Sequence, residues 1–316
     1  MSEDIKADVK LVPTVKSFDQ KVFERFGGKL SEEEREYFLR KALPALKTRP
    51  RLEDSPDVGM SGQIDQDRAD LLRKQAQAEI NVDYLRAKIV ENRLAGLMAE
   101  QKWLGQNAVV TETSEFDDWL RGADRVVEYQ GEPPFRLIID FTSESDSHRL
   151  GDEKLRPIFH SIETGLLGEV KYFRSAGDKK QHWLKKLPKV LICFEPATAR
   201  RLADPKQADL ENSWAKITCL LEIKKQIEFF MKYNANPARR GYRAGLAEEI
   251  AESYRHVLDL VKIIYLETIG NFVEKVLKIK MPQSGVEALL VKLEPMLIEK
   301  VSQRDRSAAA LLKLVS

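Results

Sequence analysis

Apolar positions follow helical spacing at both ends of the chain. Residues 31–47 carry Ser31 and Glu34 at the positions of a helix capping box, and residues 64–104 are rich in Ala, Leu, Arg, Lys, Gln and Glu, with Gly105 as a stop. After Pro196 the helical spacing returns over about 206–233, 240–280 and 284–315. The pattern predicts helices on both sides of a different central zone, with residues 64–104 forming one long helix or two.

The central zone contains short apolar runs with β-branched residues at 125–130, 135–142, 168–175 and 189–195. The first two runs flank the turn signal 131-GEPP-134, which predicts an antiparallel hairpin. Residues 152–165 are interpreted as a helix that tolerates Pro157 and ends at Gly165. We therefore expect an α+β fold, with a small mixed sheet of about four strands, flanking helices, and long helical N- and C-terminal extensions.

Composition divides the chain into three segments. Residues 1–62 form a helical arm with a linker at 48–63, where Pro, Gly, Ser and charged residues concentrate; residues 63–198 form an α/β core with a leading long helix; and residues 199–316 form a helical C-terminal domain. The apolar stripe of the last segment predicts either packing within the chain or a homo-oligomer interface. Its members are Val257, Leu258, Leu260, Val261, Ile264 and Leu266.

Composition excludes several classes of protein. The sequence has 43% hydrophobic and 32% charged residues and no apolar run of the roughly 18 to 20 residues that a membrane-spanning helix needs. The charged start, MSEDIKADVK, does not resemble a secretory leader, so we expect a cytoplasmic protein without a membrane partner. Cys193 and Cys219 are expected to be buried thiols, and the four histidines lack metal-ligand spacing. The net charge of +2 argues neither for nor against nucleic acid.

Two aspartates stand where strands usually bury apolar side chains. Asp124 opens the run 125–130, and Asp140 follows Leu137, Ile138 and Ile139. Fifteen residues separate the two aspartates, which fits two short strands and a loop, so the hairpin would bring both carboxylates to one edge of the sheet. Converging carboxylates repel each other and cost free energy to desolvate. The pair therefore predicts a hard divalent cation such as Mg²⁺, which is commonly held by one or two carboxylates, water and substrate phosphate.

These motifs resemble the PD-(D/E)XK nuclease superfamily over about residues 90–196. Gly122-Ala123-Asp124 is similar to the first aspartate motif, and Ile138-Ile139-Asp140-Phe141-Thr142 to the strand of the second. Thr142 stands where the family has lysine, and Lys154 on the following helix is the candidate replacement, as in some divergent members. The resemblance implies a restriction-endonuclease-like core, Glu100 of the preceding helix as a third acid, and Mg²⁺ or Mn²⁺ on Asp124, Asp140 and Glu100. It also implies that Lys154 stabilises developing charge while a DNA phosphodiester is hydrolysed.

Alternatives stand beside this interpretation. Glu169 and Lys171 form a literal ExK with Asp140 as the upstream aspartate, although a predicted helix intervenes. Asp124 after Ala123 is also typical of a turn, and Asp140 could pair structurally with Lys154 or Arg156. The acidic cluster 115-EFDD-118 could also contribute a metal ligand, but we interpret it as a solvated helix start whose charges suit the helix dipole.

The C-terminal segment adds a candidate nucleic-acid contact. Residues 237–245 place Arg239, Arg240 and Arg243 around Tyr242, a combination that could bind phosphates and stack on a base, or could be a solvated loop. The rival function is a non-catalytic helical scaffold or nucleic-acid-binding protein with a degenerate nuclease fold. Thr142 in place of lysine is the feature that favours this rival.

Overall fold

A four-stranded mixed sheet lies at the centre of the computed structural model, which describes residues 16–54, 61–130, 134–143, 146–176, 181–195, 197–198, 208–236, 244–278 and 282–315. Its strands are β1 (Ala108–Glu112), β2 (Arg125–Tyr129), β3 (Phe135–Thr142) and β6 (Lys189–Cys193), in the order β1-β2-β3-β6. The first three strands are antiparallel neighbours, and β6 runs parallel to β3. The antiparallel β2–β3 pairing confirms the predicted hairpin.

The return from β3 to β6 passes through a helical crossover, as parallel neighbours require. Asp146 caps α7 (Ser147–Arg149) by accepting bonds from the backbone N–H groups of His148 and Arg149. A π-helical stretch, Leu150–Leu155, continues into α8 (Arg156–Thr164), which tolerates Pro157 in its first turn and ends at Gly165 with a φ of 70°. This outcome matches the predicted helix.

A separate two-stranded sheet covers part of the central sheet. It pairs β4 (Gly168–Arg174) with β5 (Gln181–Leu187) in an irregular antiparallel register. Val170 and Phe173 of β4 pack on Ala123, Val126 and Ile138. The run 168–175, expected to belong to one small sheet, therefore forms a strand outside the central sheet.

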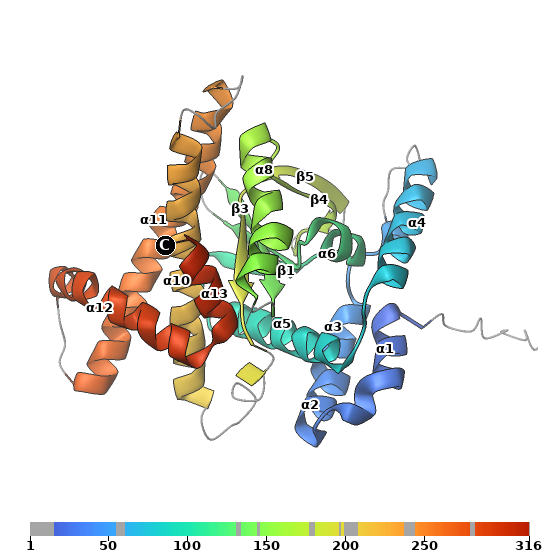
Figure 1. Ribbon diagram of the computed structural model, residues 1–316, viewed down its shortest axis with the longest axis horizontal. Coiled ribbons are helices and arrows are strands. Elements are labelled where there is room, and N and C mark those ends of the chain that lie inside the picture. Colours follow the sequence, from blue (N-terminus) through green and yellow to red (C-terminus); the bar gives the residue numbers. More distant parts are fainter. Residues whose placement is uncertain are drawn as a thin grey trace, which may run out of the picture.

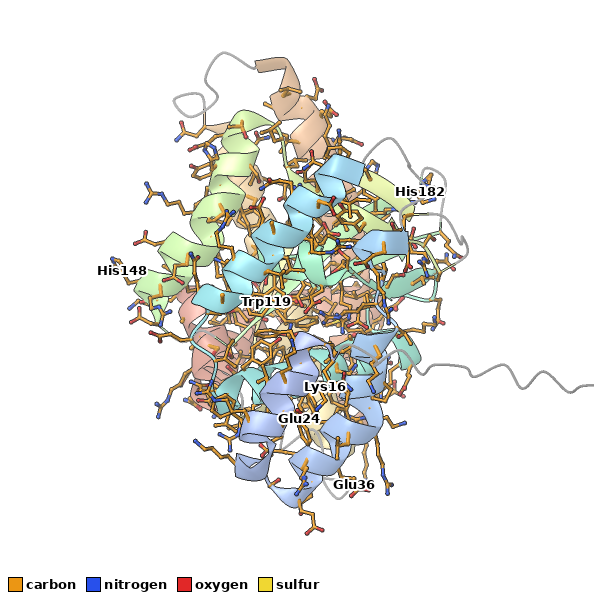
Figure 2. The ribbon with its side chains drawn as sticks, turned by 90° about the vertical axis from the view of Figure 1, so that its right-hand side faces the viewer. Lys16, Glu24, Glu36, Trp119, His148 and His182 are labelled. Carbon is orange, nitrogen blue, oxygen red and sulfur yellow. The ribbon has the colours of Figure 1, made fainter. Side chains whose placement is uncertain are left out.

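The N-terminal segment forms short helices that pack on the core: α1 (Phe18–Phe26), a 3-10 turn (Gly27–Lys29), α2 (Glu32–Tyr37), a π-helical stretch (Phe38–Ala42), α3 (Leu43–Lys47) and a second 3-10 turn (Leu52–Asp54). Ser31 and Glu34 form the predicted capping box of α2. The predicted range 64–104 contains two helices, α4 (Ser61–Gln77) and α5 (Val82–Glu100), because Asn81 caps a new start, and α5 ends at Glu100 rather than at Gly105. Figure 2 shows Trp119 beside α4 and the N-terminal helices, with Glu36 at the lower end of the view.

The C-terminal segment is helical, as predicted, and covers the opposite side of the sheet (Figure 1). It comprises α10 (Ala208–Ala235), α11 (Ala244–Leu277), α12 (Gln283–Arg304) and α13 (Arg306–Val315), so the predicted last helix is interrupted at Asp305. The apolar stripe of α11 is packed within the chain: Val257, Leu258, Val261 and Ile264 are buried in the main core, and Leu260 and Leu266 pack against it.

One hydrophobic cluster joins all three predicted segments, from Val22 through Val127 to Val315. Cys193 and Cys219 are buried in it as free thiols, as expected. The α+β class with helical flanks is confirmed, but β1 and β5 were not predicted. None of the helices in the described part of the chain is both long and apolar enough to cross a membrane.

A buried carboxyl on α10 leads to a stability prediction. Glu222 is fully buried, its Oε2 accepts from the Cys193 N–H at 3.2 Å, and its Oε1 has no partner. Burial raises the pKa of Glu222 well above 4.5, so the stability it supports is full below the unfolded pKa and is lost as pH rises toward the folded pKa.

Glu222→Gln is expected to raise the free energy of unfolding at pH 8 by about 1–3 kcal/mol, because the amide never ionises and each unit of pKa shift corresponds to about 1.4 kcal/mol, with little gain at pH 4. Urea unfolding at both pH values measures the effect, with the exposed Glu287→Gln as the matched control. An equal pH dependence in the wild type and Glu222→Gln would contradict the assignment.

Candidate active site

A tight turn sets Asp124 against the end of β3. Helix α6 (Glu115–Arg121) ends at Gly122, whose φ of 58° is in the left-handed region, and Ala123 leads directly to Asp124. A Cβ atom on Gly122 would lie 2.7 Å from Asp140 Oδ2 and 2.9 Å from Lys189 Nζ. Both the backbone conformation and the close approach therefore require glycine at this position.

Asp124 and Asp140 come together across the β2–β3 hairpin. The Asp124 N–H donates to the Ile139 carbonyl at 3.0 Å, and Asp124 Oδ2 accepts from the Phe141 N–H at 2.7 Å. These two bonds lie on either side of Asp140, so the aspartates meet at one end of the hairpin, as the spacing predicts. Both residues are nearly inaccessible to solvent, at 4% and 3% exposed.

Two lysines bind the carboxylate of Asp140. Lys154 Nζ, from the crossover, lies 3.2 Å from Oδ1, and Lys189 Nζ, from the start of β6, lies 3.1 Å from Oδ2. Lys189 also donates to the Arg121 carbonyl at 3.0 Å and has a side chain 14% exposed, whereas the Lys154 side chain is 34% exposed. The Asp140 carboxylate raises the pKa of Lys154 above its ordinary value. Lys154 is therefore the more accessible of the two cations.

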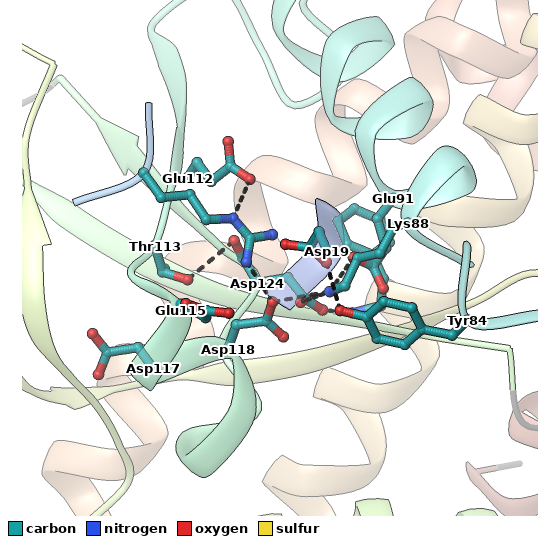
Figure 3. A network of polar contacts seen from close by, with 12 residues as sticks. Asp19, Tyr84, Lys88, Glu91, Glu112, Thr113, Glu115, Asp117, Asp118 and Asp124 are labelled. Carbon is teal, nitrogen blue, oxygen red and sulfur yellow. Dashed lines mark hydrogen bonds and ion pairs between the residues drawn. The ribbon is translucent and has the colours of Figure 1, made fainter. Parts of the chain in front are cut away.

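Lys88 of α5 supplies a third ammonium group, on the Asp124 side (Figure 3). Its Nζ lies 2.7 Å from Glu91 Oε2, 2.9 Å from Asp118 Oδ2 and 3.7 Å from Asp124 Oδ1. Lys88 is only 6% exposed. A protein cation thus lies among three carboxylates next to the predicted metal ligand.

The segment after α3 adds Arg49 to the same network. Its guanidinium is 2.8 Å from Glu112 Oε1 through Nε and 2.8 Å from Asp118 Oδ2 through Nη1, and the residue is 7% exposed. Arg49, in the predicted linker, is therefore buried, whereas Arg51, Glu53 and Asp54 of the same segment are exposed. Residues 115–118 do begin a helix, as predicted, but they are not solvated, because Asp117 is fully buried and Asp118 lies in this network.

The three acids near Lys88 differ in the direction of their pKa shifts. Burial, together with the negative charges of Glu91 and Asp118, raises the pKa of Asp124 well above its ordinary value. Burial also raises the pKa of Glu91 despite the nearby Lys88. Burial acts on Asp118 in the same direction, but Lys88 and Arg49 reverse the effect and hold its pKa below the ordinary value. The resident cations therefore neutralise Asp118 better than Asp124.

Glu100, the predicted third acid, lies at the exposed end of α5. It is the last residue of the helix, nine residues beyond Glu91 and about 13 Å farther along a helix with a rise of 1.5 Å per residue. Glu91 is the acid of α5 whose negative charge raises the pKa of Asp124. Position on the helix face, which the sequence alone left open, decides between the two residues.

The alternative ExK residues face other partners. Lys171 pairs with Asp67 of α4, which also accepts from the Tyr172 hydroxyl at 2.6 Å. Glu169 pairs with Arg121 and accepts from Trp183 Nε1 at 3.2 Å. Neither residue contacts Asp140. The proposed basic contact at Arg239, Arg240, Tyr242 and Arg243 lies outside the described residues.

The two aspartates are the carboxylates that a magnesium ion would need here, but each oxygen of Asp140 is already paired with a lysine. Within the described ranges no group of three or more His, Cys, Asp or Glu side chains is arranged to hold a metal. Two carboxylates with water and substrate phosphate are nevertheless an ordinary Mg²⁺ set, and Asp124 and Asp140 provide that pair. Sequence reasoning missed Arg49, Lys88, Glu91 and Lys189, for which the only local signal is the i,i+3 spacing of Lys88 and Glu91.

Comparison with known proteins adds no family. No protein-family model, curated protein or solved structure matches the chain. The function is therefore argued from the geometry of the site.

Proposed function

We propose that the chain is a metal-dependent hydrolase that cleaves DNA phosphodiesters, with a PD-(D/E)XK-like core. The observation that supports this is the meeting of two buried carboxylates, Asp124 before β2 and Asp140 on β3, with Lys154 reaching back to Asp140 from the crossover. That arrangement fits the resemblance in which lysine has moved from the motif strand to the following helix. Although Thr142 stands where the family has lysine, Lys154 would still provide the site with a positive charge.

The residues would divide the chemistry between them. Asp124 and Asp140 would hold Mg²⁺ or Mn²⁺, which supplies Lewis-acid polarisation of the phosphate and lowers the pKa of a bound water. Burial and the negative charges of Glu91 and Asp118 raise the pKa of Asp124, which opposes the charged form that would bind the metal. Lys154, partly exposed, would turn from Asp140 toward the phosphate oxygens and stabilise the charge that develops on them.

Cleavage of supercoiled plasmid, linear duplex, single-stranded DNA and RNA by the purified full chain tests the proposal. We expect cutting of DNA with Mg²⁺ or Mn²⁺, none with EDTA, and none by an Asp140→Asn protein purified in parallel. Folded protein that cuts no substrate with either metal would overturn the proposal.

One observation favours a second function, a non-catalytic nucleic-acid-binding or scaffold protein with a degenerate nuclease fold. Lys88 already provides Glu91, Asp118 and Asp124 with a cation. DNA binding in EDTA, measured by fluorescence anisotropy, combined with no cleavage in any metal would support this candidate. Cleavage that depends on Asp140 would exclude it.

The two lysines on Asp140 are expected to differ in role. Lys154→Met should lower cleavage by about a hundredfold, the usual effect of removing one donor to a developing charge, and change stability little because Lys189 still neutralises Asp140. Lys189→Met should instead lower the free energy of unfolding by about 2 kcal/mol, since it leaves the Arg121 carbonyl without its donor. Cleavage rates and urea unfolding of both variants make the comparison. A greater loss of cleavage in folded Lys189→Met would reverse the assignment.

A further inference from the structure

Glu91 and Asp118, the carboxylates near Asp124, already have a positive charge beside them, because the Lys88 ammonium lies 2.7 Å from the first and 2.9 Å from the second. We infer that Lys88 is a resident counter-ion of this site and that its ammonium must move away from Asp124 before a divalent cation can bind there. The inference rests on the proposed function, since it concerns the same pair of carboxylates. It adds a residue that sets the affinity for the metal.

The three Lys88 distances indicate how the movement can occur. Nζ is close to Glu91 and Asp118, at 2.7 and 2.9 Å, but 3.7 Å from Asp124 Oδ1. The ammonium can therefore withdraw from Asp124 while it keeps its two nearer partners. Glu91 is one helical turn from Lys88 on α5, so the partner moves with the helix that carries the lysine.

Neighbouring groups limit how far Lys88 can withdraw. Arg49 Nη1 contacts the same Asp118 oxygen, Oδ2, at 2.8 Å, so two cations already share that atom. The centroid of the Tyr84 ring lies 5.9 Å from Lys88 Nζ, so an aromatic ring borders the ammonium on another side. A divalent ion on Asp124 would therefore stay close to the ammonium, and repulsion between the two cations in a buried site would lower metal affinity.

Removal of the ammonium is expected to reverse this effect. Mn²⁺ titration of the full chain by isothermal calorimetry and by electron paramagnetic resonance of free Mn²⁺ should show about a hundredfold tighter binding to Lys88→Met than to the wild type, given the strength of cation repulsion at such distances. Lys88→Arg keeps the charge and should bind like the wild type. The exposed Lys74→Met is the matched control and should also leave binding unchanged.

A double variant protects the test against misfolding. Lys88→Met combined with Glu91→Gln removes one cation and the acid that the structure pairs most closely with it, while Asp124 and Asp140 remain. This protein should show the same gain in Mn²⁺ affinity. If folded Lys88→Met and the double variant both bind Mn²⁺ no tighter than the wild type, the inference is wrong.

Failure of this inference and failure of the proposed function give different results. Tighter Mn²⁺ binding by Lys88→Met without DNA cleavage by any of the proteins would leave the counter-ion role intact and refute the nuclease. Metal-dependent cleavage by the wild type with unchanged Mn²⁺ affinity in Lys88→Met would do the reverse.

Discussion

Replacing Asp140 with asparagine is expected to lower metal-dependent cleavage of DNA by about a thousandfold or more, because the loss of several kcal/mol of metal-borne charge stabilisation corresponds to at least that factor. Asparagine keeps the size of the side chain but removes the charge opposite Lys154 and Lys189. Initial rates on supercoiled plasmid with Mn²⁺ at fixed salt measure the change, since both the rate and DNA affinity depend on ionic strength.

The control for Asp140→Asn lies at the start of the same crossover. Asp146 is exposed and caps α7, and asparagine is an equally good capping residue, so Asp146→Asn should retain full cleavage. Asp140→Asn also leaves two lysines without their carboxylate, which can destabilise the fold. A double variant with Lys154→Met removes one of those lysines. Recovery of cleavage in the double variant, rather than of stability alone, would refute a metal-binding role for Asp140.

Local sequence was enough to predict the aspartate pair because a hairpin is a short-range structure. Asp124 immediately precedes β2, Asp140 lies on the neighbouring strand β3, and Lys154 follows in the next helical segment. Their meeting needs only the strand pattern and the turn signal. The same reasoning predicted the antiparallel β2–β3 pair and the crossover helix.

The remaining charges of the site come from distant parts of the chain. Arg49 reaches Asp118 across 69 positions and Lys88 reaches it across 30. No local pattern records such contacts, and on α5 the choice between Glu91 and Glu100 depends on how the helix is rotated against the sheet. Long-range packing thus determined the part of the site that neutralises the acids.

The two unpredicted strands fail the usual strand pattern for different reasons. β5 has the sequence 181-QHWLKKL-187 with exposed His182, Trp183, Lys185 and Lys186, so only one of its faces is partly covered. β1 is a five-residue edge strand, and only Ala108 among its residues is fully buried. Hydrophobic periodicity detects strands through burial, and these two strands bury little of their length.

Replacing Asp117 with alanine is expected to lower the free energy of unfolding by about 4 kcal/mol, because it leaves two buried backbone N–H groups without partners, at about 1–3 kcal/mol each. Asp117 Oδ1 accepts from the Lys171 N–H at 2.7 Å, and Oδ2 accepts from the Tyr172 N–H at 3.0 Å and the Ser114 hydroxyl at 2.6 Å. The side chain is completely buried. It therefore ties α6 to β4 across more than fifty positions.

Asparagine is expected to rescue Asp117 poorly. Its single carbonyl oxygen can replace one carboxylate oxygen, but its amide group would face the other backbone N–H, and two donors cannot bond each other. Asp117→Asn leaves one of the two backbone N–H groups unpaired. It should therefore lower the free energy of unfolding by roughly half or more of the amount expected for Asp117→Ala. Glu115→Gln, in the same first turn of α6, should cost less than about 1 kcal/mol as the control, since an amide oxygen can still accept from Gln75.

The Asp117 variants also separate a structural role from a chemical one. Because α6 delivers Gly122 and Asp124 to the site, loosening its tie to β4 should lower metal-dependent cleavage in proportion to the unfolded or displaced fraction. Urea unfolding curves, read beside cleavage rates at a temperature where the variant stays folded, measure both effects. Full stability in Asp117→Ala would show that the backbone N–H groups of Lys171 and Tyr172 find other partners. A cleavage loss without a stability loss would instead place Asp117 in the chemistry, a role its complete burial beneath α6 argues against.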